Sequence, residues 1–320
     1  MRLRLIAMLA VLTLASGPVM LAAQDLPVVR VGDLGYNDAS SEPLYGAAAG
    51  IFRRDGLDVK VSALTGGGAI IAAIAGGSLE AGFSNAVSAA QAIQRGIPII
   101  VLTPAGEYPG DRSDTVLVKA RGSKLKTAAD LNGKTIAVTT LGGGLEASAR
   151  LWIDKNGGDS KSAHFLELAG SEMTAALKAG RIDAAMLSEP LLTENRSEVE
   201  QLADPFSAVA PRWTVGVFVA SKAWVTANPD LARKFVQGMQ DTAHWANAHH
   251  ADTAKIAAPL TGIDLPTFAL MARSRYGYEL SAALLQPELD EAVADGQLKA
   301  PVDAAQWVAD AQPYWRGIKR

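Results

Sequence analysis

The sequence predicts an α/β protein of two similar lobes, each built on a parallel sheet and joined to the other by a two-strand hinge. Three observations predict this fold: an internal repeat, an alternation of short apolar strands with helices, and two extended segments that border the second copy of the repeat. The chain has 320 residues, which is enough for two lobes with separate hydrophobic cores.

The repeat relates residues 65–85 to residues 169–189. Each copy has a glycine turn, a short apolar helix, a glycine stop, a strand and a polar turn. The residues that punctuate the two copies fall at one offset: Gly66 with Gly170, Gly76 with Gly180, and Ser84 with Ser188. A chain built twice from one α/β unit is expected to have a ligand-binding cleft between its two lobes.

The first unit alternates strands with helices. Short β-branched or apolar runs predict the strands, and Pro43 and the glycines predict where helices begin and end. The expected order is strand 28–31, polar loop 32–41, helix from 43 to near 56, strand 57–61, helix after 65–68, strand 80–83, helix 86–95 and strand 97–102. This β-α-β-α-β order predicts a parallel sheet covered by helices.

The second unit follows the same pattern. It is expected to contain a turn at 130–133, strand 134–139, a glycine turn at 141–144 opening a helix through 153, and strand 164–168. The repeat copy comes next, then a turn-rich stretch at 203–211 and strand 213–220. The chain from Lys222 onward is expected to be helical, with Pro229 and Pro266 near helix starts.

Thr115–Lys119 and Val215–Ala220 lie at the borders of the second unit. We expect them to be the paired crossings between the lobes. The first lobe then contains residues 24–118 and 215–320, and the second contains residues 119–214. Two crossings form a hinge, and a hinge beside a cleft implies closure around a ligand.

Residues 1–23 have the pattern of a cleaved signal peptide. Two arginines precede the apolar stretch Leu5–Leu14, and small residues follow up to Ala23. An apolar stretch of about ten residues is too short to span a bilayer, so no stable membrane insertion is expected. The sequence therefore predicts a mature protein in the periplasm.

The composition narrows the classes of function. The chain has no cysteine, which excludes disulfides, thiolate metal sites, cysteine nucleophiles and a lipid anchor on a cysteine. Without Arg2 and Arg4 it has 28 basic and 33 acidic residues, a net charge of −5, with the two signs interspersed. Neither nucleic acid nor an anionic membrane is an expected partner.

No motif for metal binding or catalysis is found. The four histidines lack zinc-site spacing and no hydrolase motif is present, so no metal, cofactor or catalytic residue is expected. We expect a monomer.

Three segments resemble one family: residues 48–61, residues 126–138 and residues 179–185. They are similar, in order and spacing, to the nitrate/sulfonate/taurine/bicarbonate-type solute-binding proteins of ABC transporters, which include aliphatic sulfonate-binding-like and thiamine-pyrimidine-binding-like members. The resemblance covers essentially the whole mature chain. It implies a type II periplasmic binding fold that passes a small-molecule ligand to a membrane permease with its ATPase, and it leaves the ligand open.

Four loops are expected to converge on the cleft at the carboxyl ends of strands: 36–41, 65–68, 84–85 and 140–144. Each precedes a helix and can offer backbone N–H groups to a small anionic head group such as a sulfonate or carboxylate. The predicted ligand-binding residues are Tyr36, Asp38, Ser41, Thr65, Gly66, Gly67, Ser84, Asn85, Thr140, Gly142, Gly143, Glu189 and Trp213.

Each of these residues has a structural alternative. The glycines can be tight turns, and Ser84 and Ser188 can be helix N-caps. Glu189 falls where the first copy has Asn85; it can bind an amine, as in a zwitterion such as taurine or an aminopyrimidine, or it can cap its own helix or pair with a cation at the hinge. Asp38 can be a solvated loop residue, whereas Tyr36 and Trp213 are the aromatic residues best placed to contact a ligand.

Three functions fit the sequence. The first is a non-enzymatic receptor for an ABC importer. The second is a pyrimidine-synthesising enzyme on the same scaffold, which we disfavour because that enzyme family carries a cysteine-rich metal motif and this chain has no cysteine. The third is a periplasmic sensor partner, which a neighbouring permease and ATPase gene would argue against.

Overall fold

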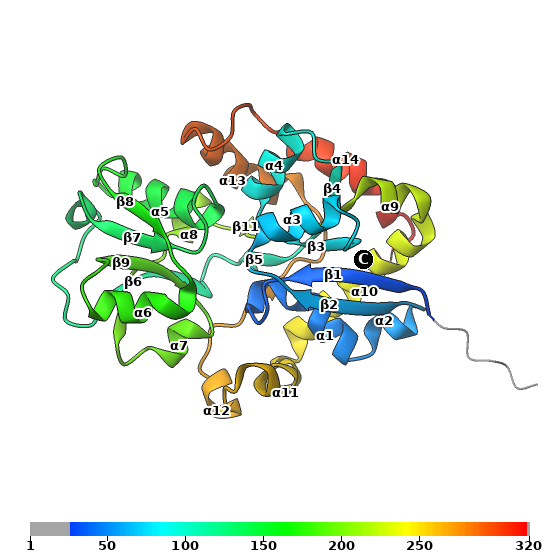
Figure 1. Ribbon diagram of the computed structural model, residues 1–320, viewed down its shortest axis with the longest axis horizontal. Coiled ribbons are helices and arrows are strands. Elements are labelled where there is room, and N and C mark those ends of the chain that lie inside the picture. Colours follow the sequence, from blue (N-terminus) through cyan, green and yellow to red (C-terminus); the bar gives the residue numbers. More distant parts are fainter. Residues whose placement is uncertain (1–25, 319–320) are drawn as a thin grey trace, which may run out of the picture.

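Within residues 26–318, which the computed structural model describes, the chain forms two lobes, each around a five-stranded sheet (Figure 1). A small three-stranded sheet lies at the border between them. This confirms the two-lobed α/β fold that the sequence predicts. The signal peptide expected at residues 1–23 lies outside the described residues.

The sheet of lobe 1 has the strand order β2-β1-β3-β12-β4. Its strands are β1 (Val28–Asp33), β2 (Asp58–Ala63), β3 (Ala81–Ser84), β4 (Ile99–Pro104) and β12 (Val217–Ser221). Strand β1 pairs in parallel with β2, with Val28 opposite Asp58, and in parallel with β3. Strand β12 runs antiparallel to both β3 and β4, so the sheet is mixed rather than wholly parallel.

The sheet of lobe 2 repeats this arrangement, with the order β8-β7-β9-β6-β10. Its strands are β6 (Thr115–Ala120), β7 (Thr135–Val138), β8 (His164–Glu167), β9 (Ala184–Ser188) and β10 (Val199–Ala203). Strand β7 pairs in parallel with β8 and β9, as β1 does with β2 and β3. Strand β6 is antiparallel to β9 and β10, in the place that β12 has in lobe 1. The sequence repeat therefore corresponds to matching positions in two sheets.

The chain passes between the lobes twice, beside the small sheet. This sheet has the order β11-β5-β13, from β5 (Gly106–Tyr108), β11 (Trp213–Thr214) and β13 (Arg275–Tyr276). The chain leaves lobe 1 after β5 and returns to it after β11, and these two strands pair with each other. The segments expected to be crossings, 115–119 and 215–220, instead contribute β6 and β12 to the two main sheets.

Helices cover the faces of the sheets. The helices are α1 (Glu42–Ala48), α2 (Ile51–Arg54), α3 (Gly67–Ala75), α4 (Ala86–Gln94), α5 (Gly144–Lys155), α6 (Gly170–Lys178), α7 (Leu191–Glu194), α8 (Phe206–Val209), α9 (Lys222–Ala227), α10 (Pro229–Ala248), α11 (His250–Thr261), α12 (Leu265–Phe268), α13 (Ala282–Ala294) and α14 (Ala304–Trp315). The single helix expected from residue 43 to near 56 is divided into α1 and α2, because Gly50 between them has a φ of 70°. Such a left-handed conformation is open mainly to glycine.

Each lobe has its own apolar core. In lobe 1, Ile70 and Ile74 of α3 pack with the sheet, and Phe52 stacks on Phe235 of α10 at 5.9 Å between ring centroids. In lobe 2, one apolar cluster contains Ile136 and the other contains Val116. The C-terminal helices α10 and α14 pack on lobe 1, as expected, while α13 also contacts α5 of lobe 2. Helix α13 therefore reaches the border between the lobes.

Candidate functional site

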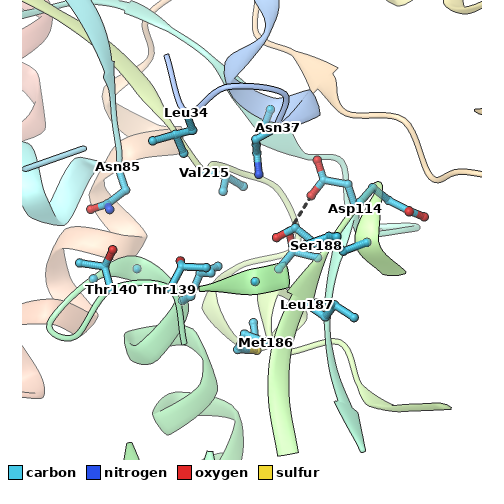
Figure 2. Close-up of a pocket in the computed structure, with 18 of the residues that line it drawn as sticks. Leu34, Asn37, Asn85, Asp114, Thr139, Thr140, Met186, Leu187, Ser188 and Val215 are labelled. Carbon is cyan, nitrogen blue, oxygen red and sulfur yellow. Dashed lines mark hydrogen bonds between the residues drawn. The ribbon is translucent and has the colours of Figure 1, made fainter. Parts of the chain in front are cut away.

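A cleft of about 440 Å³ lies between the lobes, where the strands of both sheets end. Figure 2 shows side chains from the two lobes facing each other across it, with Asn85 opposite Thr140 and Asn37 opposite Ser188. The carboxyl ends of parallel strands are the usual position of ligand sites in open α/β sheets. This volume suits a small organic molecule.

Loops that follow β1, β2 and β3 form the wall of lobe 1. The residues of lobe 1 after these strands that line the cleft include Leu34, Tyr36, Asn37, Thr65, Gly66, Gly67 and Asn85. The wall of lobe 2 comes from the equivalent loops after β7, β8 and β9. The lining residues there include Thr139, Thr140, Gly143, Gly170, Ser171, Ser188 and Glu189. The repeat has thus placed the same kinds of polar loop on both sides.

Four helices begin at the cleft: α3, α4, α5 and α6. In α4, the Asn85 side chain accepts a hydrogen bond from the backbone N–H of Ser88 at 2.7 Å. In the residues described, no side chain caps the first turn of α3, α5 or α6. Uncapped first turns offer backbone N–H groups and the positive end of a helix dipole to a polar or anionic group.

Aromatic and aliphatic side chains form the inner part of the cleft. Trp213 of β11 is completely buried, donates a hydrogen bond from Nε1 to the carbonyl oxygen of Phe206 at 3.0 Å, and packs edge-on against the Phe206 ring. Tyr36 lies on the other side and packs edge-on against Phe268. Leu34, Met186 and Val215 add apolar surface (Figure 2). A ligand in this cleft contacts both apolar groups and hydrogen-bonding loops.

The Glu189 carboxylate is held by hydrogen bonds within the protein. It accepts from the backbone N–H and the hydroxyl of Thr193 at 3.0 and 2.9 Å, and from the backbone N–H of Ala272 at 3.2 Å. Burial raises the pKa of Glu189, and these hydrogen bonds oppose the rise. The alternative in which Glu189 caps its own helix is therefore observed, with an additional contact to a segment of lobe 1.

Glu288 of α13 also lines the cleft, and its carboxyl group is not satisfied. The residue is only 2% exposed, and within residues 26–318 neither carboxyl oxygen has a hydrogen-bond partner. Burial raises the pKa of Glu288 to about 8. Sequence reasoning missed this residue, although one signal was present: Glu288 interrupts the apolar stripe formed by Leu285, Leu289 and Ala292.

Nine of the thirteen predicted binding residues line the cleft: Tyr36, Thr65, Gly66, Gly67, Asn85, Thr140, Gly143, Glu189 and Trp213. The other four, Asp38, Ser41, Ser84 and Gly142, do not. The Asp38 carboxylate forms a buried ion pair with Arg273. The Ser41 hydroxyl donates to the carbonyl of Asn37, the Ser84 hydroxyl donates to the carbonyl of Asn85, and the carbonyl of Gly142 accepts from Gln91.

Other lining residues were not predicted, chiefly Asn37, Asp114, Thr139, Ser188 and Glu288. Ser188 caps no helix; its hydroxyl accepts a hydrogen bond from the Thr115 hydroxyl at 2.8 Å. Asp114, which lies between β5 and β6, accepts hydrogen bonds from the hydroxyls of Thr115 and Ser274.

The part of the chain described in the structure contains no His/Cys/Asp/Glu cluster that could hold a metal ion. No helix between residues 26 and 318 is both long enough and apolar enough to span a membrane.

The model of the "NMT1/THI5 like" family matches residues 38–253. The chain belongs to this family. A candidate binding protein of Brucella abortus is 24% identical over 300 residues, with 89% of this chain and 91% of the relative covered.

Two solved structures show the fold. The alkanesulfonate-binding protein of Xanthomonas axonopodis pv. citri, bound to MOPS, gives a TM-score of 0.71 at 20% identity, covering 88% of this chain and 97% of that chain. The periplasmic nitrate-binding protein of Synechocystis gives 0.72 at 16% identity, covering 91% and 88%. The family resemblance and the periplasmic binding fold predicted from the sequence are thereby confirmed.

Proposed function

We infer that the protein is the solute-binding receptor of an ABC importer, which captures a small organic solute between its lobes and passes it to a permease. The observation that carries this proposal is the cleft of about 440 Å³ on which four helix N-termini converge from two lobes. The structural likeness to sulfonate- and nitrate-binding proteins supports it. The signal-peptide pattern of residues 1–23 supports a periplasmic location.

The solute that this cleft suits best is a zwitterion such as taurine or a related amino compound. The uncapped first turns of α3, α5 and α6 suit an anionic head group. The ionisable side chains among the lining residues are Tyr36 and four carboxylic acids, Asp114, Glu189, Glu194 and Glu288. These acids favour a ligand that also carries a hydrogen-bond donor or a positive charge.

An aminopyrimidine or an aromatic carboxylate is the second candidate ligand. Tyr36 supports it, because its partly exposed ring lines the cleft and can pack on a planar ligand, and the buried Trp213 borders the same cleft. The two candidates differ in the shape of the ligand, and one panel of compounds separates them.

The first experiment measures the thermal midpoint of the mature chain after unfolding and refolding, which removes bound solute. The panel holds taurine, alkanesulfonates, nitrate, bicarbonate, aromatic carboxylates and aminopyrimidines. A ligand at about a hundred times its Kd stabilises the folded state by about 2.7 kcal/mol, which gives a clear shift. If no compound shifts the midpoint, the proposed ligand classes are wrong.

A matched pair of variants places binding in the cleft. Thr140→Val removes a hydroxyl from the cleft wall and should weaken binding about 3- to 10-fold, the effect of one lost hydrogen bond. Thr226→Val makes the same change on the exposed helix α9, away from the cleft, and should not alter affinity. Equal affinities for both variants and the wild type would place the ligand elsewhere.

The receptor role itself is tested by mass spectrometry and by transport. Ligand released by denaturing the complex should be recovered unchanged, whereas a modified product would indicate an enzyme. Uptake of the labelled ligand should fall in cells that lack the protein. Unchanged uptake would favour a sensor partner.

A further inference from the structure

We propose that Glu288 is the specificity-determining residue of the cleft and recognises an amino or ammonium group of the ligand. The proposal rests on the proposed receptor function and deepens it by assigning one end of the ligand to one side chain. It rests on the position of Glu288, on its lack of partners, and on the space that Gly144 leaves beside it.

Glu288 has unmet hydrogen-bonding capacity at the cleft surface. Glu288 is only 2% exposed, yet neither of its carboxyl oxygens has a hydrogen-bond partner among the residues described. A buried carboxyl group without hydrogen-bond partners is destabilised relative to one in water, and a ligand donor removes that penalty. A group of this kind, lining a cleft, is therefore suited to bind a ligand donor rather than to stabilise the ligand-free fold.

Glu189 does not fill this role, although the repeat had pointed to it. Three protein donors already occupy its oxygens, from Thr193 and Ala272. Of these two buried acids, Glu288 is the one whose oxygens have no protein donor in the described residues.

The backbone next to Glu288 is shaped to admit its carboxyl group. A Cβ added to Gly144 would lie 2.2 Å from Oε1 of Glu288 and 3.9 Å from the Cβ of Asn85. Any residue larger than glycine would displace the carboxyl group. The first turn of α5, which belongs to lobe 2, therefore lies beside both Glu288 and Asn85 of lobe 1. A ligand group at this position can contact both lobes.

The surrounding elements do not supply a counter-charge. Within the described structure, α4, α8 and β11, which pack on α13, contain no ionisable side chain. On α5, Arg150 pairs with Glu146 of the same helix, and Lys155 pairs with the neighbouring Glu291 of α13. On α14, Asp310 is exposed. The raised pKa of Glu288, which has burial as its cause, agrees with the absence of a nearby cation. A ligand ammonium group would supply one.

Matched pairs of compounds that differ only by an amino group test the proposal: taurine with ethanesulfonate, 4-aminobenzoate with benzoate, and 4-aminopyrimidine with pyrimidine. Titration calorimetry gives the ratio of affinities within each pair. The wild type should prefer the amino member of at least one pair by about tenfold or more, as expected for a hydrogen bond to a charged group. Glu288→Gln should reduce that ratio several-fold, and Asp290→Asn, on the exposed side of the same helix, should not change it.

Gly144→Ala provides a second, independent variant. It keeps Glu288 but moves its carboxyl group. Because this group is the flexible end of a side chain, the protein should still fold. The preference for the amino member of a pair should fall as it does in Glu288→Gln. The apparent melting midpoint of the ligand-free variant checks that the fold is retained.

Two results would overturn the inference, and they differ from each other. If the wild type binds both members of each pair equally, or if Glu288→Gln keeps the full preference, Glu288 does not recognise the amino group, and the receptor function stands. If the wild type binds no member of any pair, the proposed ligand classes fail and this inference fails with them.

Discussion

At the scale of single residues, Asp38 shows how a polar side chain near a cleft can be used for packing within the protein and not for ligand binding. Arg273 donates to both carboxylate oxygens at 2.8 and 2.9 Å, and the backbone N–H of Ser274 and the hydroxyl of Tyr45 add further hydrogen bonds. Burial alone would raise the pKa of Asp38, but these partners lower it below its ordinary value. Asp38 therefore ties the segment around residue 273 to the first loop of the cleft.

The first prediction concerns this buried ion pair. Arg273→Met leaves the Asp38 carboxylate buried without its cation, which should cost about 3–5 kcal/mol of unfolding free energy in urea at neutral pH. The double variant Asp38→Asn with Arg273→Met should recover part of this loss. Arg53→Met breaks an ion pair whose arginine side chain is 61% exposed and should cost much less, because solvent screens an exposed ion pair. Equal costs for the two arginines would contradict this account.

The second prediction concerns the pH dependence of stability. The pKa of Glu288 is about 8 in the folded protein and near its ordinary 4.5 in the unfolded chain. Between these values the folded state retains a proton that the unfolded chain has released, so the free energy of unfolding falls as pH rises, by up to about 1.4 kcal/mol per pH unit. The cost is absent below pH 4.5 and complete above pH 8. Glu288→Gln should remove this component.

The measurement is a set of urea titrations of ligand-free wild type and Glu288→Gln across that pH range. The stability difference between the two proteins should grow in favour of the variant as pH rises. Asp290→Asn changes an exposed carboxylate of the same helix and should run parallel to the wild type. A constant difference between Glu288→Gln and the wild type would mean that Glu288 titrates normally.

At the scale of elements, the sequence predicted the repeated units well. Apolar strands bounded by glycine turns identified β1 to β4 and β7 to β9, since local pattern and tertiary position agree there. Strands β5, β10 and β13 were not predicted, because they are short or polar and are defined by partners far away in sequence. The direction of β12 within lobe 1 also depends on its distant partners.

The candidate site could be predicted where it lies in loops of the repeat. Gly66, Asn85 and Thr140 follow strands directly, and strand ends determine where such loops meet. Glu288 is on α13, which the chain reaches only after both main sheets are complete, and no local pattern shows that this helix borders the cleft. Asp38 was assigned to the cleft wrongly for a related reason: its ion-pair partner, Arg273, is 235 residues away in the sequence and no local pattern reveals it.

The third prediction uses β11 as a reporter. Trp213 is the tryptophan that lines the cleft, and the chain has five others. Trp213→Phe should remove most of the fluorescence change that the ligand causes, while the apolar packing against Phe206 is largely kept. A fluorescence titration with the panel compound that gives the largest thermal shift measures this. Trp224→Phe, on α9, should retain the change. A full signal in Trp213→Phe would show that the ligand does not reach β11.

At the scale of the whole molecule, the two lobes meet on both sides of the cleft. On one side Ala272 donates its backbone N–H to Glu189, and the Ser274 hydroxyl bonds to Asp114. On the other side, Gln91 of lobe 1 donates to the carbonyl of Gly142 in lobe 2 at 3.2 Å. A Cβ added to Gly66 would lie 3.9 Å from the Thr140 hydroxyl oxygen, across the lobes. The structure is therefore a closed arrangement.

The fourth prediction tests closure with a cross-link, which the absence of native cysteines makes specific. In the variant Gly66→Cys with Thr140→Cys, the Cβ of residue 66 would lie 3.9 Å from the position of the Thr140 hydroxyl oxygen. A cysteine sulfur at residue 140 replaces that oxygen, so the two sulfur atoms can meet across the closed cleft. Gly66 has extended backbone, so a side chain there is unstrained. Under mild oxidation the disulfide should form faster with ligand present, because the ligand shifts the population toward the closed form. Non-reducing electrophoresis measures the rate.

Two further measurements make this result decisive. Each single-cysteine variant must still show the thermal shift with ligand, which establishes that neither substitution abolishes binding. Once formed, the cross-link should also slow ligand release, since the lobes can no longer separate. If the cross-link forms at the same rate with and without a bound ligand, and release is unchanged, the lobes do not close around the solute. The hinge formed by β5 and β11 would then be a rigid connection, and a permease could not distinguish the loaded receptor by its shape.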